Sequence, residues 1–354
     1  MAAIGDFGPF FCSWIELMAQ LGPTSEDPSR RKGVGPLIPP LTEAQRPLRQ
    51  QIFERIRAAG LIPRVTLARE LDVSPASVTT ICAELIDAGL IEEVAPPRDA
   101  ETARGRPAVA LGVRAGAHLV AGMKLSDREH TAVIVDFAGN LIADMAVPRQ
   151  PGPMTLPDLL AAVETLLAGV CAKAQIAPKD LSAIGIGVPG FVDVALGIVH
   201  WSSVLHDRNV PLAAAATAHL GVPVSIDNDA NLVALAELWF GAGRGLSNFA
   251  VVTIEHGVGM GFVMNHRIFR GSGRLGMELG HTKVQLDGAL CRCGQRGCLE
   301  AYVADYALAR EATTALNRPI TDTLSINALL ESLYDHAKAG NTTARSIFRR
   351  AGRY

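Results

Sequence analysis

The stretch that decides the fold runs from Glu278 to Glu300 and reads ELGHTKVQLDGALCRCGQRGCLE. It holds one histidine and three of the six cysteines of the chain, namely His281, Cys291, Cys293 and Cys298. One imidazole and three thiolates form the ligand set of a closed, structural zinc site. The glycines between the second and third of these cysteines permit the tight turns that such a site needs. We therefore predict that the four residues bind zinc.

Two other interpretations of these cysteines are weaker. Buried free cysteines beside a surface histidine fit less well, because three cysteines within eight positions usually mark a metal site. A disulfide would leave one of the three cysteines over, and reducing compartments disfavour the bond. The metal interpretation is the one that accounts for all four side chains.

Length and composition limit the classes of protein to consider. At 354 residues the chain is long enough for two or three domains, and its 49% hydrophobic and 19% charged residues are typical of a globular protein. A formal net charge of -2 gives no overall field that attracts nucleic acid, so any DNA contact must be local. No apolar run of about 18 residues indicates a transmembrane helix, and the first 21 residues lack the basic start of a secretion signal. We predict a cytoplasmic protein.

The first 45 residues are predicted to form a flexible N-terminal arm. Short apolar segments alternate there with glycine, proline, serine and a small basic group at positions 30–32. The apolar positions from Phe10 to Leu21 leave open an amphipathic helix that docks on a partner or on the rest of the chain.

Residues 46–112 have the pattern of a winged helix-turn-helix. Helical periodicity from Pro47 ends at Gly60, a second helix is expected at 65–71, and a third follows Ser74 and ends at Gly89. Ser74 is suited to cap that third helix, and the proline after it is suited to the first helical position. Two short strands, at 90–94 and 108–111, would enclose a wing. In such a module the last helix can lie in the major groove of DNA.

Five residues of this module are predicted to contact DNA. Between Arg46 and Arg114 the chain has ten arginines and nine acids, a balance of only +1, so no uniformly basic face is expected. The wing sequence Arg-Gly-Arg-Pro nevertheless places two guanidinium groups where a minor groove attracts them, and short hydroxyls on the third helix suit phosphates or base edges. The predicted DNA-binding residues are Ser77, Thr79, Thr80, Arg104 and Arg106. A module used only for protein contact, with solvated arginines, is the alternative.

Past residue 112 the sequence pattern becomes that of an α/β domain. Strands are predicted at 117–125, 131–136, 141–147, 184–188, 222–226, 249–254 and 261–265, and helices at 156–174, 229–240, 302–316, 326–339 and from about 342 onward. One buried strand ends at Pro189-Gly190, and another ends at Asp227-Asn228-Asp229, directly before a helix. Polar residues at a strand end, against a helix N-terminus, are where α/β proteins place ligand chemistry.

Together these features resemble the ROK family of bacterial repressors and sugar kinases, in its transcriptional-regulator branch with an N-terminal winged helix. The resemblance is carried by the winged helix, the Pro189-Gly190 strand end, the Asn228-Asp229 pair, the Glu278-Leu-Gly-His281 motif and the cysteine run that ends at Glu300. It implies an actin-like, two-lobed sugar-kinase fold behind a DNA-binding head. It also implies zinc at the four predicted ligands and a sugar held in the cleft between the lobes. The implied sugar-binding residues are Gly190, Asn228, Asp229, Glu278, His281 and Glu300.

The sequence departs from the kinases of this family at both phosphate loops. The kinases have an Asp-X-Gly-Gly-Thr turn after the first strand, where this chain has residues 124–128, Lys-Leu-Ser-Asp-Arg, without a glycine pair to cradle an anion. The second loop, at 255–259, carries Glu255, which would repel a triphosphate by about 1 kcal/mol or more. Asp229 matches the kinase base, so an ATP-dependent, glucokinase-like sugar kinase with a DNA-binding head stays as the alternative. If the chain is not a kinase, no catalytic residue is expected.

We therefore predict a non-enzymatic, sugar-responsive transcriptional regulator, a repressor of carbohydrate-metabolism genes that acts as a homodimer or dimer of dimers. Its expected partners are operator DNA and a sugar or sugar phosphate, with a phosphotransferase-system protein as an alternative controlling partner. The expected division is the arm at 1–45, the head at 46–112, the first lobe at 113–227 and the second lobe at 228–354. Compared with the family, we expect this sequence to lack the usual C-terminal end of the domain.

Overall fold

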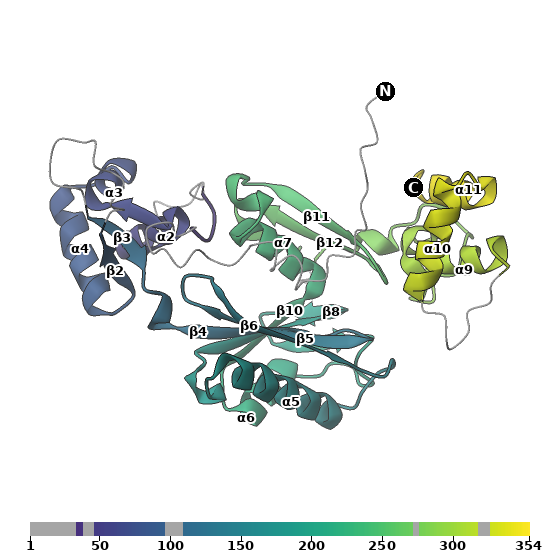
Figure 1. Ribbon diagram of the computed structural model, residues 1–354, viewed down its shortest axis with the longest axis horizontal. Coiled ribbons are helices and arrows are strands. Elements are labelled where there is room, and N and C mark those ends of the chain that lie inside the picture. The colour runs from purple at the N-terminus through teal and green to yellow at the C-terminus, as the bar shows by residue number, and fades with distance from the viewer. Residues whose placement is uncertain (1–32, 38–45, 96–108, 272–275, 318–325) are drawn as a thin grey trace. The chain divides into compact units, whose positions relative to one another are not determined.

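The structure is a computed structural model that describes residues 33–37, 46–95, 109–271, 276–317 and 326–354 (Figure 1). The chain divides into two compact units, one of residues 1–229 and 236–247 and the other of residues 230–235 and 248–354. Within the described residues, no helix combines the length and the apolar character that crossing a membrane requires.

The described residues between 46 and 113 of the first unit form three helices and a small sheet. The helices are α2 (Leu48–Ala59), α3 (Arg64–Glu70) and α4 (Pro75–Asp87), and the strands are β1 (Leu61–Pro63), β2 (Ile91–Val94) and β3 (Ala110–Val113). The strands form an antiparallel sheet in the order β1-β3-β2. An apolar core joins them, because Ile52 and Ile56 of α2, Leu67 of α3 and Leu85 of α4 are all buried against Ile91 and Leu111 of the sheet.

Two details of this part differ from the sequence prediction. Strand β1 was not predicted, because three residues between two helices carry too little periodicity to be recognised. The last strand lies two residues further along the chain than predicted, since Val113 pairs with Ile91 and both side chains close the core. The N-cap prediction is confirmed, because the Ser74 hydroxyl accepts a hydrogen bond from the Ser77 amide at 3.0 Å.

The rest of the first unit is built on a five-stranded sheet. Its strands are β4 (Leu119–Lys124), β5 (Glu129–Asp136), β6 (Leu141–Pro148), β7 (Ala183–Val188) and β10 (Val224–Asn228), in the order β10-β7-β4-β5-β6. Strands β10, β7 and β4 are parallel, and β4, β5 and β6 are antiparallel. Helices α5 (Leu156–Ala174) and α6 (Leu212–Leu220) cover one face of this sheet (Figure 1). The hairpin β8 (Phe191–Asp193) and β9 (Ile198–Trp201) follows β7, and 3-10 turns lie at 115–117, 178–180 and 242–245.

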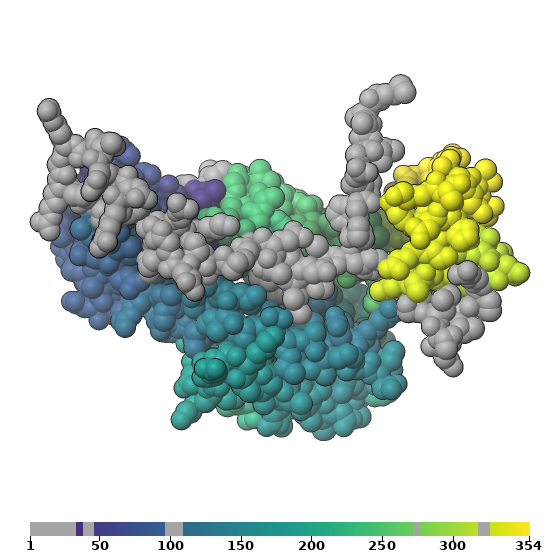
Figure 2. All heavy atoms as spheres, in the orientation of Figure 1, coloured from purple at the N-terminus to yellow at the C-terminus, as the bar shows by residue number. Residues whose placement is uncertain are grey.

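The second unit contains a smaller sheet and a set of helices. Strands β11 (Phe249–Ile254), β12 (Val258–Met264) and β13 (Arg267–Ile268) form an antiparallel sheet, and helix α7 (Asp229–Trp239) contributes its middle residues to this unit. A 3-10 helix, η6 (Leu279–His281), precedes the cysteine run, and helices α8 (Glu300–Val303), α9 (Asp305–Ala315), α10 (Ile326–Lys338) and α11 (Thr342–Ala351) follow it. The last of these helices pack through a core of alanine, leucine and isoleucine and appear in yellow in Figure 2.

Two predictions in this unit are corrected. Strand β12 begins at Val258, not at Gly261, because glycine lets it run close to α7: a Cβ on Gly261 would lie 2.5 Å from the Ala230 carbonyl oxygen. The helix predicted at 302–316 is two helices, α8 and α9. Ala304 leaves the helical conformation because the next amide, that of Asp305, donates to the Glu255 carbonyl oxygen at 2.9 Å.

Candidate functional site

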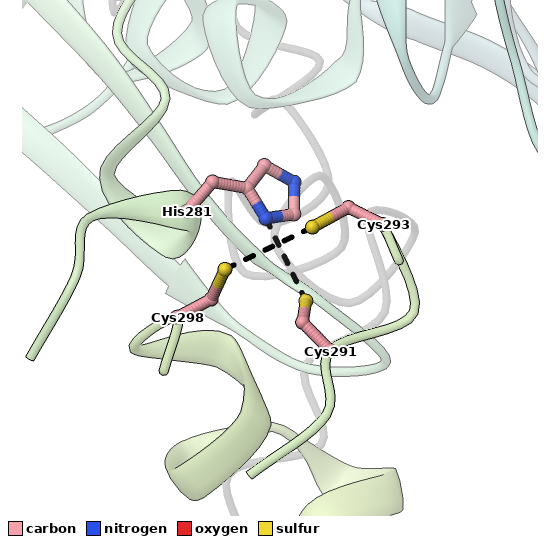
Figure 3. Close-up of side chains that lie close together, drawn as sticks. All are labelled: His281, Cys291, Cys293 and Cys298. Carbon is pink, nitrogen blue, oxygen red and sulfur yellow. Dashed lines mark hydrogen bonds between the residues drawn. The ribbon is translucent and has the colours of Figure 1, made fainter. Parts of the chain in front are cut away.

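The four predicted metal ligands lie together in the second unit. Their ligand atoms are all within 4.8 Å of one another, and Figure 3 shows the four side chains pointing toward a common centre. The Cys291 Sγ is 3.7 Å from the His281 Nδ1, and the Cys293 Sγ is 3.8 Å from the Cys298 Sγ. Sulfur atoms held about 2.3 Å from a tetrahedral zinc ion are about 3.8 Å apart, so the spacing fits such an ion.

Tight backbone turns bring the cysteines together. The Cys291 amide donates to the Gln295 carbonyl oxygen at 2.8 Å, which closes the loop between the first two cysteines and the third. Gly294 and Gly297 both have positive φ angles, of 86° and 76°. A side chain at Gly297 would place its Cβ 1.8 Å from the Gln285 carbonyl oxygen, so only glycine fits there. The predicted function of these glycines as turn residues is confirmed by their geometry.

The charge around the cluster suits bound thiolates. Lys283 Nζ donates to Cys298 Sγ at 3.0 Å, which places a positive charge beside a ligand that would be negative. Burial raises the pKa of the Cys291 thiol to about 12, so without a cation this sulfur keeps its proton. A metal ion is the partner that stabilises the charged form of such a sulfur.

Two acidic residues support the cluster from outside. The Glu278 Oε2 lies 4.0 Å from the His281 Nε2, on the opposite side of the ring from the nitrogen that faces the cysteines. The Glu300 side chain is buried: its Oε2 accepts from the Val258 amide at 3.2 Å, and its Oε1 lies 3.5 Å from Cys291 Sγ. Glu300 therefore connects the candidate metal site to the backbone of β12, and Glu278 flanks the imidazole of His281, as outer residues of metal sites commonly do.

The first unit brings together the other predicted sugar-binding residues. Asn228 ends β10 opposite Val188 of the parallel strand β7, and its Nδ2 donates to the Gly190 carbonyl oxygen at 2.9 Å. Gly190 has a φ of 115°, and a Cβ there would lie 2.2 Å from the Trp201 carbonyl oxygen. Asp229 is the first residue of α7. The strand ends and the helix N-terminus thus gather one main-chain carbonyl, one amide and one carboxylate.

The turn that corresponds to the first phosphate loop is closed by its own hydrogen bonds. The Ser126 amide donates to His130 Nδ1 at 3.3 Å, the Ser126 hydroxyl donates to the Glu129 carbonyl oxygen at 2.6 Å, and Arg149 donates to the Ser126 carbonyl oxygen at 3.1 Å. Burial, with help from the charge of Arg149, lowers the pKa of His130 to about 4, so the ring is neutral and accepts the bond. The Ser126 amide is therefore not turned toward a phosphate.

The second loop is also occupied by internal bonds. The Glu255 amide donates to the Gly257 carbonyl oxygen at 2.9 Å, and the His256 Nδ1 lies 3.0 Å from the Asp305 Oδ2. A nucleotide triphosphate would meet two carboxylates at this loop, those of Glu255 and Asp305. The geometry of both loops agrees with the sequence argument against ATP.

Two of the three predicted DNA-binding residues on α4 are exposed, whereas those of the wing lie outside the described residues. Thr79 and Thr80 are exposed, and Ser77 is half-buried with its hydroxyl 2.8 Å from that of Ser74. The other side of α4 buries Val78 and Leu85 in the core. The Thr79 hydroxyl donates to the Pro75 carbonyl oxygen at 2.8 Å, which leaves its oxygen lone pairs as acceptors. Arg104 and Arg106 belong to residues 96–108, which the structure does not describe.

Two residues near the cluster were missed by sequence reasoning. The Tyr306 hydroxyl lies 3.4 Å from the Glu300 Oε1 and 3.7 Å from Cys291 Sγ, and the Arg292 guanidinium is 4.1 Å from the centre of the Tyr306 ring. Lys283 was also missed. Tyr306 follows Glu300 by six residues, but the break at Ala304 makes helical spacing a poor guide to their contact.

The polar strand ends, the two sheets and the His-Cys₃ cluster define a sugar-kinase-like α/β protein. The chain belongs to the ROK family, whose family model matches residues 121–354. It is 31% identical over 307 residues to the DNA-binding transcriptional repressor Mlc of Escherichia coli K12, which covers 85% of this chain and 74% of the relative. It is 30% identical over 257 residues to the xylose repressor of Caldicellulosiruptor bescii, covering 73% of this chain and 63% of the relative. The family prediction is confirmed.

Solved structures of ROK proteins are also similar to this chain. A ROK family transcriptional regulator, a homolog of the Escherichia coli Mlc protein, matches with a TM-score of 0.69 and 28% identity over 86% of this chain and 77% of its own. A ROK family glucokinase from Streptomyces griseus, solved with glucose and AMPPNP, matches with a TM-score of 0.56 and 29% identity over 66% of this chain and 76% of its own. The regulator match includes more of this chain than the kinase match does.

Proposed function

We propose that this ROK-family protein is a sugar-responsive transcriptional regulator that acts as a repressor. The observation that carries the proposal is a pair of features in one chain: a helix α4 that exposes Thr79 and Thr80 in a three-helix module, and phosphate loops that satisfy their own hydrogen bonds. Relatives that are named xylose repressor and N-acetylglucosamine repressor support it. In this proposal residues 46–112 are a winged-helix head, 113–227 the first lobe and 228–354 the second lobe. The flexible arm predicted for residues 1–45 is corrected at residues 33–37, whose backbone amides donate hydrogen bonds to the head and to the end of α7.

The proposed effector is a sugar or sugar phosphate. A pyranose presents a ring of hydroxyls, and carboxylates, amides and imidazoles around it can accept and donate in matched pairs. The first lobe would supply Gly190, and the second lobe would supply Asn228, Asp229, Glu278, His281 and Glu300. Binding to both lobes would favour one relative arrangement of them, and in a dimer this changes the spacing of the two heads.

The proposed metal is zinc, held by His281, Cys291, Cys293 and Cys298. The donor set and the 3.7–3.8 Å spacings support this assignment. When bound, the ion supplies structural cross-linking of the cysteine run and no reaction step. Glu278 and Glu300 flank the cluster, so the metal would fix the positions of two sugar-binding carboxylates.

Two binding measurements test the proposal. A thermal-shift screen with glucose, xylose, N-acetylglucosamine and their phosphates identifies the effector, and DNA selected from a random library identifies the operator. We expect one sugar to change the operator Kd.

Arg106→Ala should weaken DNA binding and reduce the slope of its salt dependence by about one, with Arg349→Gln, a change at an exposed arginine, as the control. A chain that binds no DNA above the level of an unrelated acidic protein would overturn the proposal.

The second candidate function is a sugar kinase. It is favoured by Asp229 at the start of α7 and by the likeness to a glucokinase solved with glucose and AMPPNP. Release of ADP is measured with the same sugars, in the native chain and in Asp229→Asn. If this substitution abolishes turnover, the kinase replaces the regulator as the function of this chain.

Control by a phosphotransferase-system protein would instead appear as operator release by that protein without free sugar.

A further inference from the structure

A short segment of the chain, Gly33–Leu37, ties the head to the end of helix α7. We call this segment the strap. Three of its amides donate to carbonyl oxygens, each at 2.8 Å: Val34 to Arg57 of α2, Gly35 to Trp239 of α7, and Leu37 to Arg244 just after α7. The strap thus hydrogen-bonds first to the head and then to the end of α7 and the turn after it. Gly33 has no room for a side chain, because a Cβ there would lie 1.9 Å from the Ala58 carbonyl oxygen.

Arg244 closes the same joint from the other side. Its Nε donates to the Gly35 carbonyl oxygen at 2.9 Å, and its Nη2 donates to the Ala58 carbonyl oxygen at 2.7 Å. Ala58 lies in the last turn of α2, where carbonyl groups lack helical partners and a positive charge is stabilising. The fork of one guanidinium therefore holds the strap and the end of α2 in one arrangement.

Arg57 forms the third contact of the joint. Its guanidinium carbon is 4.1 Å from the centre of the Trp239 ring, so the side chain of the head stacks on the last residue of α7. Burial lowers the pKa of Arg57, and its Nε has no hydrogen-bond partner within the part of the chain that the structure describes. Buried donors are nearly always paired, so this contact is one that a small rearrangement can improve.

Helix α7 connects this joint to the proposed sugar site. It begins at Asp229 and ends at Trp239, which places the two residues at opposite ends of a helix about 16 Å long. Its small residues pack tightly, since Cβ atoms added to Gly259 or Gly261 of β12 would contact Ala230. Closely packed helices shift as rigid bodies, so a movement at Asp229 reaches Trp239.

We infer that the joint of the strap, Arg57, Trp239 and Arg244 transmits sugar binding to the DNA-binding head through α7. This inference rests on the proposed function, because it needs both a sugar effect and DNA binding. Sugar at Asp229 shifts α7, Trp239 and Arg244 move with it, and the end of α2 follows through the stacked and hydrogen-bonded arginines. The head changes its orientation while its own core stays intact.

The first test separates coupling from binding. The operator Kd is measured with and without glucose, xylose and N-acetylglucosamine for the native chain, Arg244→Gln and the control Arg349→Gln, which alters an exposed arginine of α11. Allosteric coupling usually changes affinity by about 5–150-fold. We expect the sugar effect in the native chain and the control, and less than about twofold in Arg244→Gln, with the sugar Kd unchanged. An Arg244→Gln chain that keeps the native sugar effect overturns the joint alone, whereas a native chain without any sugar effect overturns the proposed function as well.

A second variant covers the case in which Arg244→Gln does not fold. Trp239→Leu removes the ring on which Arg57 stacks, and Trp239→Phe keeps an aromatic face. We expect coupling to be lost in the first and largely kept in the second. Hydrogen exchange of the strap amides gives an independent readout: the active sugar should change protection of the amides of residues 34, 35 and 37 in the native chain, and unchanged protection there would contradict the joint.

Discussion

The head and the cysteine run are stabilised in opposite ways. In the head, helix α2 and the helices after it bury isoleucine, valine and leucine side chains around one core. In the loop from 282 to 299 the buried side chains are those of Cys291 and Cys298, while Leu286 and Leu290 are 80% and 54% exposed. A segment that turns its leucines outward gains little from apolar burial, so its order must come from polar contacts and from the metal that we propose.

The largest expected effect is that of removing the metal. Apparent binding free energies of structural zinc in small zinc peptides are about 10–16 kcal/mol, far more than any single contact supplies. In Cys291→Ala we expect about one equivalent of zinc to be lost. Hydrogen exchange should then rise across 282–299 and stay unchanged across 48–94. Metal analysis and exchange mass spectrometry measure this, with Cys171→Ala, a buried cysteine of α5, as the matched control. Retained metal in Cys291→Ala would refute the cluster.

The second prediction concerns the head, where removing apolar core should lower stability without releasing metal. Leu67 of α3 is fully buried, and truncating a leucine in a core costs about 2–5 kcal/mol. Leu67→Ala should lower the free energy of unfolding of the head by this amount and weaken DNA binding near the melting temperature. Bound zinc should stay at the native level. Metal release in Leu67→Ala would mean that the two regions unfold together and that the contrast between them is wrong.

The cluster and the head could both be predicted from the sequence, whereas the joint could not. The cluster was predictable because its four ligands lie within 18 positions and glycine marks its turns, and the head was predictable because its apolar periodicity and its Ser74 cap are local signals. The joint was not predictable, because Arg244 and Gly35 are 209 residues apart and nothing in either neighbourhood marks the contact. The same holds for Glu300, whose identity the motif supplied but whose bonds to Val258 and Tyr306 depend on the tertiary fold. Its sugar-binding function stays a prediction.

The third prediction concerns the Ser126 turn, which is held by polar side chains without a metal. The unfolded chain protonates His130 near its ordinary pKa of 6.5, whereas the folded chain protonates it only near pH 4. The folded state therefore binds fewer protons in this window, and its stability is complete above pH 6.5 and falls as the pH drops toward 4. Between these two pH values the free energy of unfolding falls by about 1.4 kcal/mol per pH unit, or by about 3 kcal/mol in all.

Denaturant titrations at several pH values, with chelator present so that metal release does not contribute, measure this slope. His130→Gln should lose most of it, while His219→Gln, a change at an exposed histidine of α6, should keep it. If the two variants show the same pH dependence, His130 is not the group that titrates.

The smallest predicted effect is a change in the zinc affinity of the metal site. Lys283→Met keeps the length of the side chain but removes the charge that donates to Cys298 Sγ. Outer contacts of metal ligands typically contribute 10–100-fold in affinity, so we expect the zinc Kd to rise by that factor, or about 1.4–2.7 kcal/mol. Competition with a chelator measures it, and Lys179→Met, at an exposed lysine, is the control. An unchanged Kd would show that the thiolates alone determine zinc affinity. A rise without loss of head stability would show that one surface charge adjusts the cysteine run independently of the apolar core.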